Sequence, residues 1–142
     1  MSNLAEMLSN SVEAFAERTF LACPENGELA QTDYRTFGTE VCAWARCLRS
    51  HGVQAGARVA IITPKCADQM RAFYACWWLG AIAVPVCEIL GDLEMGFIIR
   101  DSEPTLILVD ETMPERARGN AAGTPLLRFA DFASAVVADA GP

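Results

Sequence analysis

The order of apolar and polar positions predicts that strands and helices alternate through the middle of the chain. Three short runs are almost entirely apolar: Val59–Ile62, Ile82–Val86 and Thr105–Val109. The segments before and between them carry apolar residues at helical spacing, which predicts helices near residues 34–50, 67–79 and 93–100. Strands that are apolar on both faces and separated by helices are typical of a parallel sheet covered on both sides. We therefore predict an α/β fold with three layers, in which helices flank a mainly parallel sheet.

The first part of the chain predicts a helix followed by a small N-terminal β-hairpin. Apolar residues recur at helical spacing within residues 4–15, and Ser2 or Asn3 can cap this helix. Two short apolar runs within residues 19–32 are separated by a proline and an Asn-Gly pair, which favours a hairpin. Asp33 is then placed to cap the helix that follows.

The last part of the chain differs in composition from the rest. Segment 113–124 is rich in Pro, Gly, Arg and Ala, so we expect a loop there. A short strand at residues 126–129 and a short helix at residues 130–138 should follow. We expect one domain over residues 1–142 with three parts: a helix and hairpin (1–32), an α/β core (33–110) and a loop-rich tail with a short strand and helix (111–142).

Two residues predict local details of the sheet and its helices. Pro85 has no N–H to donate to a neighbouring strand. It should therefore lie near the end of its strand, at a bulge or at an edge of the sheet. Asp92 is placed to cap the helix predicted near residues 93–100.

Composition and charge narrow the classes of protein. Apolar residues make up 52% of the 142 residues and charged residues 20%, which is enough apolar material for one packed core and excludes a disordered tail. Eleven basic residues against 18 acidic ones give a net charge of −7, so we expect no nucleic-acid partner. The longest charge-free run, Ala72–Cys87, is shorter than a membrane span and is interrupted by glycine and proline. The N-terminus lacks the features of a secretory signal, and we expect a cytoplasmic protein without a transmembrane segment.

The cysteines and the single histidine favour structural roles. None of the six cysteines belongs to a C-x-x-C pair, so zinc or thiol–disulfide chemistry is disfavoured, and we expect reduced thiols in the core. His51 and Gly52 stand where the helix from residue 34 should end, and an imidazole at a helix C-terminus is a common structural feature. Without a second histidine or a paired carboxylate, a catalytic role for His51 is disfavoured.

Glycine-rich phosphate-binding loops are absent from the sequence. The turn after the first predicted strand, residues 63–66, contains no glycine to let a pyrophosphate approach the backbone. The turn after the second, residues 87–92, carries acidic side chains that would repel phosphate. We therefore name no catalytic, cofactor-binding or metal-binding residue in this chain, and we expect no cofactor to bind within it.

Four stretches in series resemble the opening of adenylate-forming enzymes. Asp33–Phe37 and Gly52–Ile61 are similar to the family patterns T-Y-x-E-L and G-V-x-x-G-D-R-V-A-I, which flank a helix. Leu79–Val86 is similar to L-K-A-G-A-x-x-V-P-L, and Ile98–Val109 to I-L-x-D-S-x-A-x-x-L-V. The order and spacing agree from about residue 32 to residue 110, so the resemblance identifies an AMP-binding segment.

Within this family the chain most resembles bacterial long-chain fatty-acyl-CoA synthetases. Trp77–Ala81 and Val84–Glu88 are similar to the W-A-x-G-A and V-P-V-Y-E of those enzymes. Ala57 replaces the usual Asp and Cys87 the usual aromatic residue, two departures that weaken the subfamily assignment. The resemblance implies a ligase that uses Mg-ATP to form an acyl-adenylate and then transfers the acyl group to coenzyme A.

The resemblance also implies that the reacting groups lie elsewhere. In the family, the phosphate loop, the nucleotide contacts and a mobile lysine all follow the segment that this chain matches. We therefore expect an inactive N-terminal subdomain of a longer ligase, whose partners are the remaining subdomains. An alternative is a standalone, non-catalytic α/β module that binds a small ligand or a protein. A Thr/Ser/Gly-rich sequence directly downstream in the gene would favour the ligase, and a natural stop codon after Pro142 the module.

Self-association is a further expectation. A subdomain separated from its partners should keep an open sheet edge and apolar faces in water. The aromatic residues that could remain exposed are Trp44, Phe73, Trp77, Trp78 and Phe97. We therefore expect a homodimer or larger assembly, formed through a sheet edge or an apolar helix face, with exchange of a terminal segment as a further route.

Overall fold

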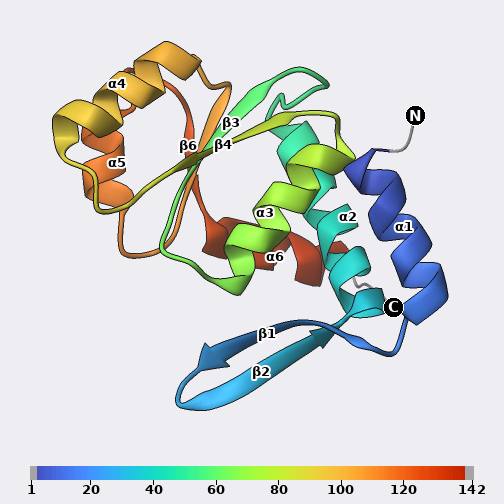
Figure 1. The fold of residues 1–142 in the computed structure, drawn as a ribbon. Helices are drawn as coiled ribbons and strands as arrows, with labels where there is room; N and C mark the ends of the chain where they lie inside the picture. The colour runs from blue at the N-terminus through green and yellow to red at the C-terminus, as the bar shows by residue number, and fades with distance from the viewer. Residues whose placement is uncertain (1–2, 140–142) are drawn as a thin grey trace.

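The computed structural model describes residues 3–139 as a layered α/β structure (Figure 1). Its elements follow in the order α1 (Leu4–Phe15), β1 (Thr19–Glu25), β2 (Glu28–Asp33), α2 (Tyr34–Ser50), β3 (Arg58–Ile62), α3 (Ala67–Trp78), β4 (Ile82–Val86), α4 (Asp92–Ser102), β5 (Leu106–Val109), α5 (Pro114–Asn120), β6 (Leu126–Arg128) and α6 (Phe129–Asp139). The predicted helices and strands of the core are confirmed to within a few residues.

Four strands form a single parallel sheet in the order β4-β3-β5-β6. β3 pairs with β4 on one side, with Ile61 opposite Pro85, and with β5 on the other, with Ile61 opposite Leu108. β5 in turn pairs with β6, which adds a fourth parallel strand from the tail of the chain. The predicted parallel sheet is therefore confirmed, and β1 and β2 form a separate antiparallel hairpin.

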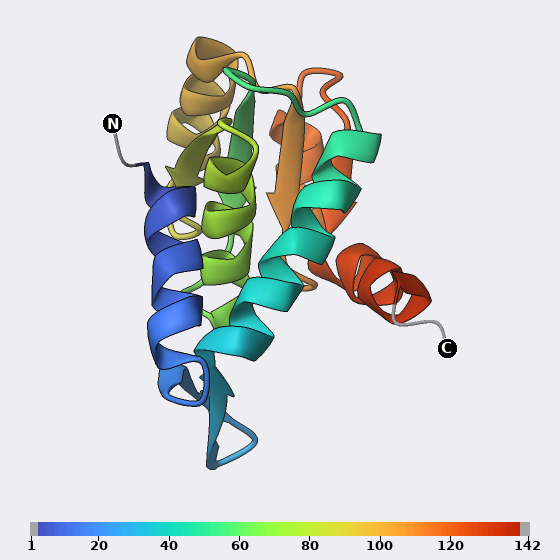
Figure 2. The same ribbon diagram turned by 90° about the vertical axis from the view of Figure 1, so that its right-hand side faces the viewer.

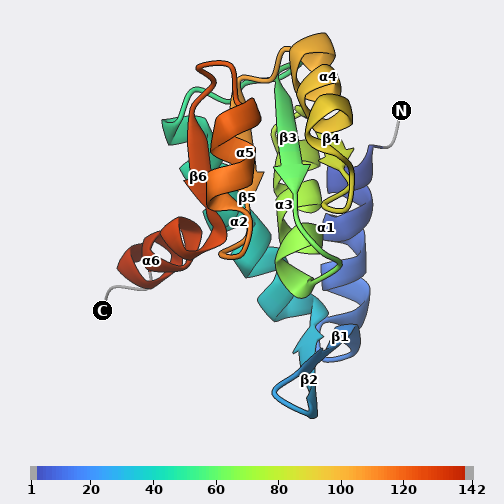
Figure 3. The ribbon, with the colours of Figure 1, turned by 90° about the vertical axis from the view of Figure 1, so that its left-hand side faces the viewer.

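Alternate residues of β3 and β5 pack on opposite faces of the sheet, in two different apolar cores. Val59, Ile61, Leu106 and Leu108 pack toward α2, α3 and α6, whereas their neighbours in sequence pack toward α4 and α5. All residues of β5, and all of β3 after Arg58, are fully buried. Figures 1 and 3 show α4 and α5 on one side of the sheet and α2, α3 and α6 on the other. The three predicted layers are therefore present.

The helix α1 and the hairpin lie outside these layers. Figure 2 shows α1 lying alongside α2 and α3, with the hairpin projecting from the end of the molecule where α2 begins. Leu8 of α1 joins Phe37 and Val41 of α2 in a small third core, and Phe20 at the base of the hairpin packs against it. Most of the hairpin beyond its base is exposed.

Both ends of α2 follow the sequence signals. The Asp33 side chain caps the helix by accepting a hydrogen bond from the backbone N–H of Thr36 at 2.7 Å. His51 is the C-cap, and Gly52 has a φ of +86°, the left-handed conformation in which a side chain would be strained. The N-cap of α1 is Asn3, which is one of the two residues predicted for this role.

The prediction of a loop at residues 113–124 is wrong, because residues 114–120 form the helix α5. Proline is suited to the first turn of a helix, where its missing N–H has no partner to lose, so Pro114 does not exclude one. Ala117 and Ala121 are small enough to pack closely beneath α4, where both are buried. The strand and helix expected after this segment are confirmed as β6 and α6.

Two further details correct the sequence-based predictions. Gly91, not Asp92, is the N-cap of α4, and the Asp92 carboxylate instead forms an ion pair with Arg116 at 2.7 Å. Trp44 is buried, because its ring packs on Phe129 and Phe132 of α6. Of the other aromatic residues expected at the surface, Trp78 and Phe97 are exposed.

The sheet has two edges, β4 and β6, as its order requires. Pro85 lies in the edge strand β4, which confirms the placement expected for it. In the part of the chain that the structure describes, no helix combines the length and the apolar character needed to cross a bilayer.

We predict that the Asp33 cap stabilises the protein in a pH-dependent way. Hydrogen bonding to Thr36, mainly from its backbone N–H, lowers the pKa of Asp33. Its contribution should therefore be complete above the unfolded pKa of about 3.9 and be lost as the pH falls through the lower folded pKa. Replacing Asp33 with Ala should lower the urea midpoint by more at about pH 7 than at about pH 2.5, because protonation removes the charge-assisted part of the cap and leaves a neutral accepting oxygen. Asp33→Asn, which keeps an accepting oxygen, is the control, and an equal loss for Asp33→Ala at both pH values would contradict the prediction.

Candidate functional site

The carboxyl ends of β3 and β5 form the first place to look for a site. The chain leaves β3 toward β4 on one side and later returns to β5 on the other side of β3. Open α/β sheets bind ligands in the crevice outside the carboxyl ends of the strands where the strand order reverses in this way. Here that crevice lies between Thr63, which follows β3, and Asp110, which follows β5.

A hollow of about 400 Å³ lies at this point. Its walls come from the two loops, from the start of α3 and from α6: Cys66, Asp68, Asp110, Glu111, Thr112, Phe129, Ala130 and Ala133. Three of these side chains are carboxylates and none is basic. The hollow is therefore electrostatically unsuited to a triphosphate. Its three carboxylates would repel the phosphates of the nucleotide that an adenylate-forming reaction uses.

Each of the three carboxylates already has local partners. Asp110 accepts hydrogen bonds from the N–H and the hydroxyl of Thr112, at 3.1 and 2.9 Å. Glu111 accepts a hydrogen bond from the N–H of Ala130 at 3.0 Å, which ties the loop after β5 to the start of α6. Asp68 pairs with Arg71 at 2.9 Å. These acids order the loops and helix starts around the hollow.

Arg71 connects the two helices beside this edge. Its guanidinium contacts Glu40 of α2 at 2.7 Å as well as Asp68 of α3, and its side chain is largely buried. Burial lowers the pKa of Arg71, but the two carboxylates outweigh that effect and raise it, so the side chain stays charged. The contact fixes the start of α3 against α2.

The only lysine of the sequence, Lys65, stands in the loop after β3. It lines a second hollow of about 540 Å³ between the hairpin and α3, together with Cys23, Glu25 and Cys66. Thr63, at the start of the same loop, is buried and its hydroxyl donates to the carbonyl of Pro64 at 3.0 Å. The Thr63 hydroxyl is thus satisfied within the loop, which presents one positive charge.

The loop after β4 is held by an arginine that the sequence analysis did not single out. Arg116 of α5 donates hydrogen bonds to the carbonyl oxygens of Glu88, at 2.8 Å, and of Leu90, in addition to its ion pair with Asp92. The segment of Arg116 was expected to be a loop, so nothing in the sequence pattern placed it beneath residues 88–92. As a result this loop is fixed, with Ile89 exposed at its tip.

His51 and the core cysteine Cys76 have structural roles. The Nδ1 atom of His51 lies 2.9 Å from the carbonyl oxygen of Cys47, and since a carbonyl only accepts, Nδ1 is the donor. All six cysteines are free, and burial raises the pKa of Cys76 to about 12, which keeps this thiol protonated. Cys76 is buried, Cys87 is exposed and the other four thiols are half-buried, so the expected core placement is confirmed fully for Cys76 alone and is wrong for Cys87. Across residues 3–139 no three His, Cys, Asp or Glu side chains lie close enough together to hold a metal ion.

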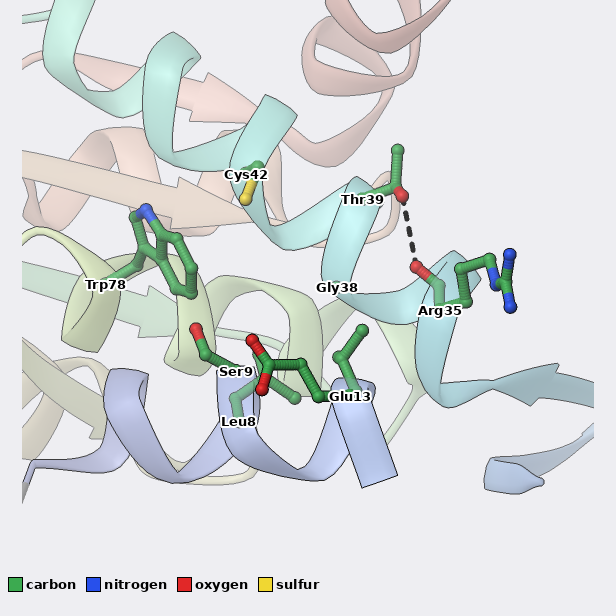
Figure 4. A pocket seen from close by; sticks show the side chains of 9 residues that line it. Leu8, Ser9, Glu13, Arg35, Gly38, Thr39, Cys42 and Trp78 are labelled. Carbon is green, nitrogen blue, oxygen red and sulfur yellow. Dashed lines mark hydrogen bonds between the residues drawn. The ribbon is translucent and has the colours of Figure 1, made fainter. Parts of the chain in front are cut away.

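A third hollow, of about 310 Å³, lies between α1 and the first half of α2 (Figure 4). Figure 4 shows Ser9 and Glu13 on one side, Thr39 and Arg35 on the other, and Trp78 at one end. Arg35 is paired with Glu17 at 2.6 Å, and Thr39 donates to the backbone carbonyl of Arg35. The groove combines an apolar floor with scattered polar groups, and the partner of Arg35, Glu17, lies outside its lining residues.

Comparison with known proteins assigns the family. The model of the AMP-binding enzyme family matches residues 8–137 of this chain. The chain belongs to the AMP-binding enzyme family. The resemblance to adenylate-forming enzymes, expected from four short stretches, is therefore confirmed over nearly the whole chain.

Curated relatives in this family are ligases of several acids. Crotonobetaine/carnitine–CoA ligase of Salmonella paratyphi A is 29% identical over 114 residues, which cover 75% of this chain and 21% of that protein. Acetyl-coenzyme A synthetase of Thiobacillus denitrificans is 32% identical, with 79% and 16% covered. Long-chain-fatty-acid–CoA ligase of Bacillus subtilis is 25% identical, with 74% and 18% covered. The chain thus spans about a fifth of the length of such relatives.

Solved structures share the fold. The N-terminal domain of FACL13 from Mycobacterium tuberculosis superimposes with a TM-score of 0.86 at 22% identity, over 96% of this chain and 36% of that one. The anthranilate CoA ligase AuaEII, in complex with anthranoyl-AMP, gives a TM-score of 0.84 at 23% identity, over 96% and 27%. The described fold of this AMP-binding segment is therefore that of part of an adenylate-forming N-terminal domain.

We predict that Gly38 permits the close packing of α1 on α2 that forms the groove of Figure 4. A Cβ atom at Gly38 would lie 2.9 Å from Cγ2 of Val12, a stiff β-branched side chain. Gly38→Ala should lower the free energy of unfolding by about 1–2 kcal/mol, although alanine favours the helix by about 0.5–1 kcal/mol.

The same substitution in a Val12→Ala background is the matched control. With the obstructing methyl groups gone, Gly38→Ala should become neutral or stabilising, as measured by urea unfolding of the four proteins of the cycle. If Gly38→Ala stabilises the protein while Val12 is present, the packing argument is wrong.

Proposed function

We propose that this chain is the N-terminal subdomain of an ATP-dependent long-chain fatty acid–CoA ligase. The observation that carries the proposal is the family match over residues 8–137 combined with a fold that covers about a third of a ligase N-terminal domain. In this proposal the complete ligase activates a fatty acid as its adenylate and passes the acyl group to coenzyme A. The remaining subdomains of that ligase are the partners of this chain.

Within the proposal the segment is a scaffold. Its carboxyl edge carries carboxylates that are engaged by Thr112, Ala130 and Arg71, and a loop fixed by Arg116. These groups order the backbone and offer no cradle for phosphate, so we assign no chemical step to a residue of this chain. We place ATP and coenzyme A on the remaining subdomains.

The proposal of a long-chain fatty acid as the substrate is based on two short stretches, Trp77–Ala81 and Val84–Glu88, which resemble long-chain fatty-acyl-CoA synthetases. The relatives act on acids as different as carnitine-type, acetyl and long-chain substrates, according to their names, so the family match alone leaves the acid open. Trp78, in the first stretch, lines the groove between α1 and α2, and Val84 and Val86, in the second, pack beneath α4. Neither stretch is part of the carboxyl-edge hollow.

We predict that the product of the complete gene releases pyrophosphate from ATP in the presence of palmitate. A panel of palmitate, octanoate, acetate, crotonobetaine and 2-succinylbenzoate, each with coenzyme A, measures the preference. Palmitate should give a kcat/KM at least about tenfold above acetate, because added methylenes buried in an apolar site raise transition-state binding.

The outcomes separate the two levels of the proposal. Pyrophosphate release with acetate or 2-succinylbenzoate but not with palmitate would retain the ligase and reject the long-chain substrate. No release with any acid would contradict the ligase itself.

A further inference from the structure

Two cysteines from different elements line the hollow between the hairpin and α3. Cys23 belongs to β1 and Cys66 is the residue directly before α3, and both line this hollow of about 540 Å³. Both thiols are free and both residues are half-buried. Figures 1 and 2 show the start of α3 beside the hairpin. No C-x-x-C spacing predicts this pair, because its members come from separate segments of the chain.

β1 passes α3 in the opposite direction, which sets the two cysteines at matching positions. The ring of Phe20, near the start of β1, packs on Tyr74 of α3 with centroids 5.7 Å apart. From Phe20 to Cys23 the strand advances about 10 Å. From Tyr74 back to Cys66 the helix recedes about 12 Å. The two cysteines therefore lie at nearly the same distance from the contact between the two rings.

The Cys23 side chain lies on the face of β1 that is turned toward α3. Successive residues of a strand point to opposite faces, so Cys23 shares its face with Leu21. Leu21 packs against the same small core as Met70 of α3, and Met70 also lines the hollow. Ala22, between the two, is exposed. The thiol of Cys23 is thus directed toward the hollow.

The hairpin and the hollow leave room for the two thiols to react. β1 and β2 pair only with each other, and the hairpin is held at its base by Phe20 and Leu21. No further strand opposes a bend of the hairpin toward α3, which would bring the two cysteines within the Cα separation of about 4.4–6.8 Å that a disulfide needs. The volume of the hollow is in the range of sites that admit a small molecule.

The other thiols are arranged less favourably. Cys42 and Cys47 lie on one helix, about 7.5 Å apart along its axis, which is too far for a disulfide. Burial raises the pKa of both, and it raises the pKa of Cys76 in the core to about 12, so these thiols are poor nucleophiles. Cys87 is exposed in the loop after β4.

We propose that Cys23 and Cys66 form a redox-active pair, which reacts with a small disulfide and closes into a disulfide bond between the hairpin and α3. One cysteine attacks a sulfur of the small disulfide, whose S–S bond breaks, and a small thiol leaves with the cysteine proton. The second cysteine attacks the resulting mixed disulfide, the bond between the two cysteines forms, and a second small thiol leaves with the second proton. The cysteine pair is oxidised and the small disulfide is reduced. The reaction needs only this chain, so it is independent of the proposed ligase activity.

Oxidised glutathione is the probe, used at about pH 8, where an ordinary thiol with a pKa of about 8.5 is partly ionised. Every protein carries Cys87→Ser, so that the exposed thiol does not react. Peptide mass mapping should find Cys23 cross-linked to Cys66, with the loss of two hydrogen atoms, and dithiothreitol should reverse the cross-link. Cys23→Ser or Cys66→Ser should stop the reaction at a mixed disulfide on the remaining cysteine. Cys42→Ser, which removes another half-buried thiol, is the matched control and should leave the cross-link unchanged.

Urea unfolding gives a second readout. Oxidation should raise the unfolding midpoint of the protein that retains both cysteines, because the cross-link constrains the unfolded chain, and it should not raise the midpoint of either single variant. Circular dichroism checks that each variant is folded. Mixed disulfides on Cys23 and Cys66 without a cross-link would overturn the proposal. So would a failure of both cysteines to react, or a cross-link from either one to a different cysteine.

Discussion

Burial of β3 and β5 on both faces is the constraint on which the rest of the structure depends. Ile61 and Ile62 point to opposite sides of the sheet, and both are fully buried. Two separate helical layers are therefore required, and each crossover supplies one helix: α3 for one face and α4 for the other. The hairpin and α1 have no such role and pack only at the edge of this arrangement.

The strands, their helices and the caps of α2 could be predicted because each depends on local signals. Apolar runs, helical spacing, Asp33 and Gly52 lie within a few residues of the feature they determine. α5 could not be predicted in this way, because its stability comes from Ala117 and Ala121 beneath α4, a contact between distant segments that alanine-rich composition does not reveal. Arg116, which holds the loop after β4, was missed for the same reason.

The carboxyl edge of the sheet shows a different limit of sequence-based prediction. The sequence shows directly that a glycine-rich phosphate loop is absent, and this absence predicts no site residue in the chain. The partners of the carboxylates could not be predicted from the sequence. Glu111 accepts a hydrogen bond from the N–H of Ala130, and Asp68 forms an ion pair with Arg71. These pairings give the acidic groups at this edge a structural role, which is consistent with a segment that supplies the scaffold of an AMP-binding enzyme.

Calorimetric titration of the 142-residue chain with Mg-ATP tests this scaffold role most directly. Because the hollow between β3 and β5 is lined by carboxylates and lacks a phosphate-cradling loop, we expect no heat of binding up to about millimolar nucleotide. Asp110→Asn, which removes one of the repelling charges while keeping an oxygen for Thr112, serves as a comparison and should bind no better than the wild-type chain. A dissociation constant in the low-micromolar range for the wild-type chain would contradict the account and establish a nucleotide site within these residues.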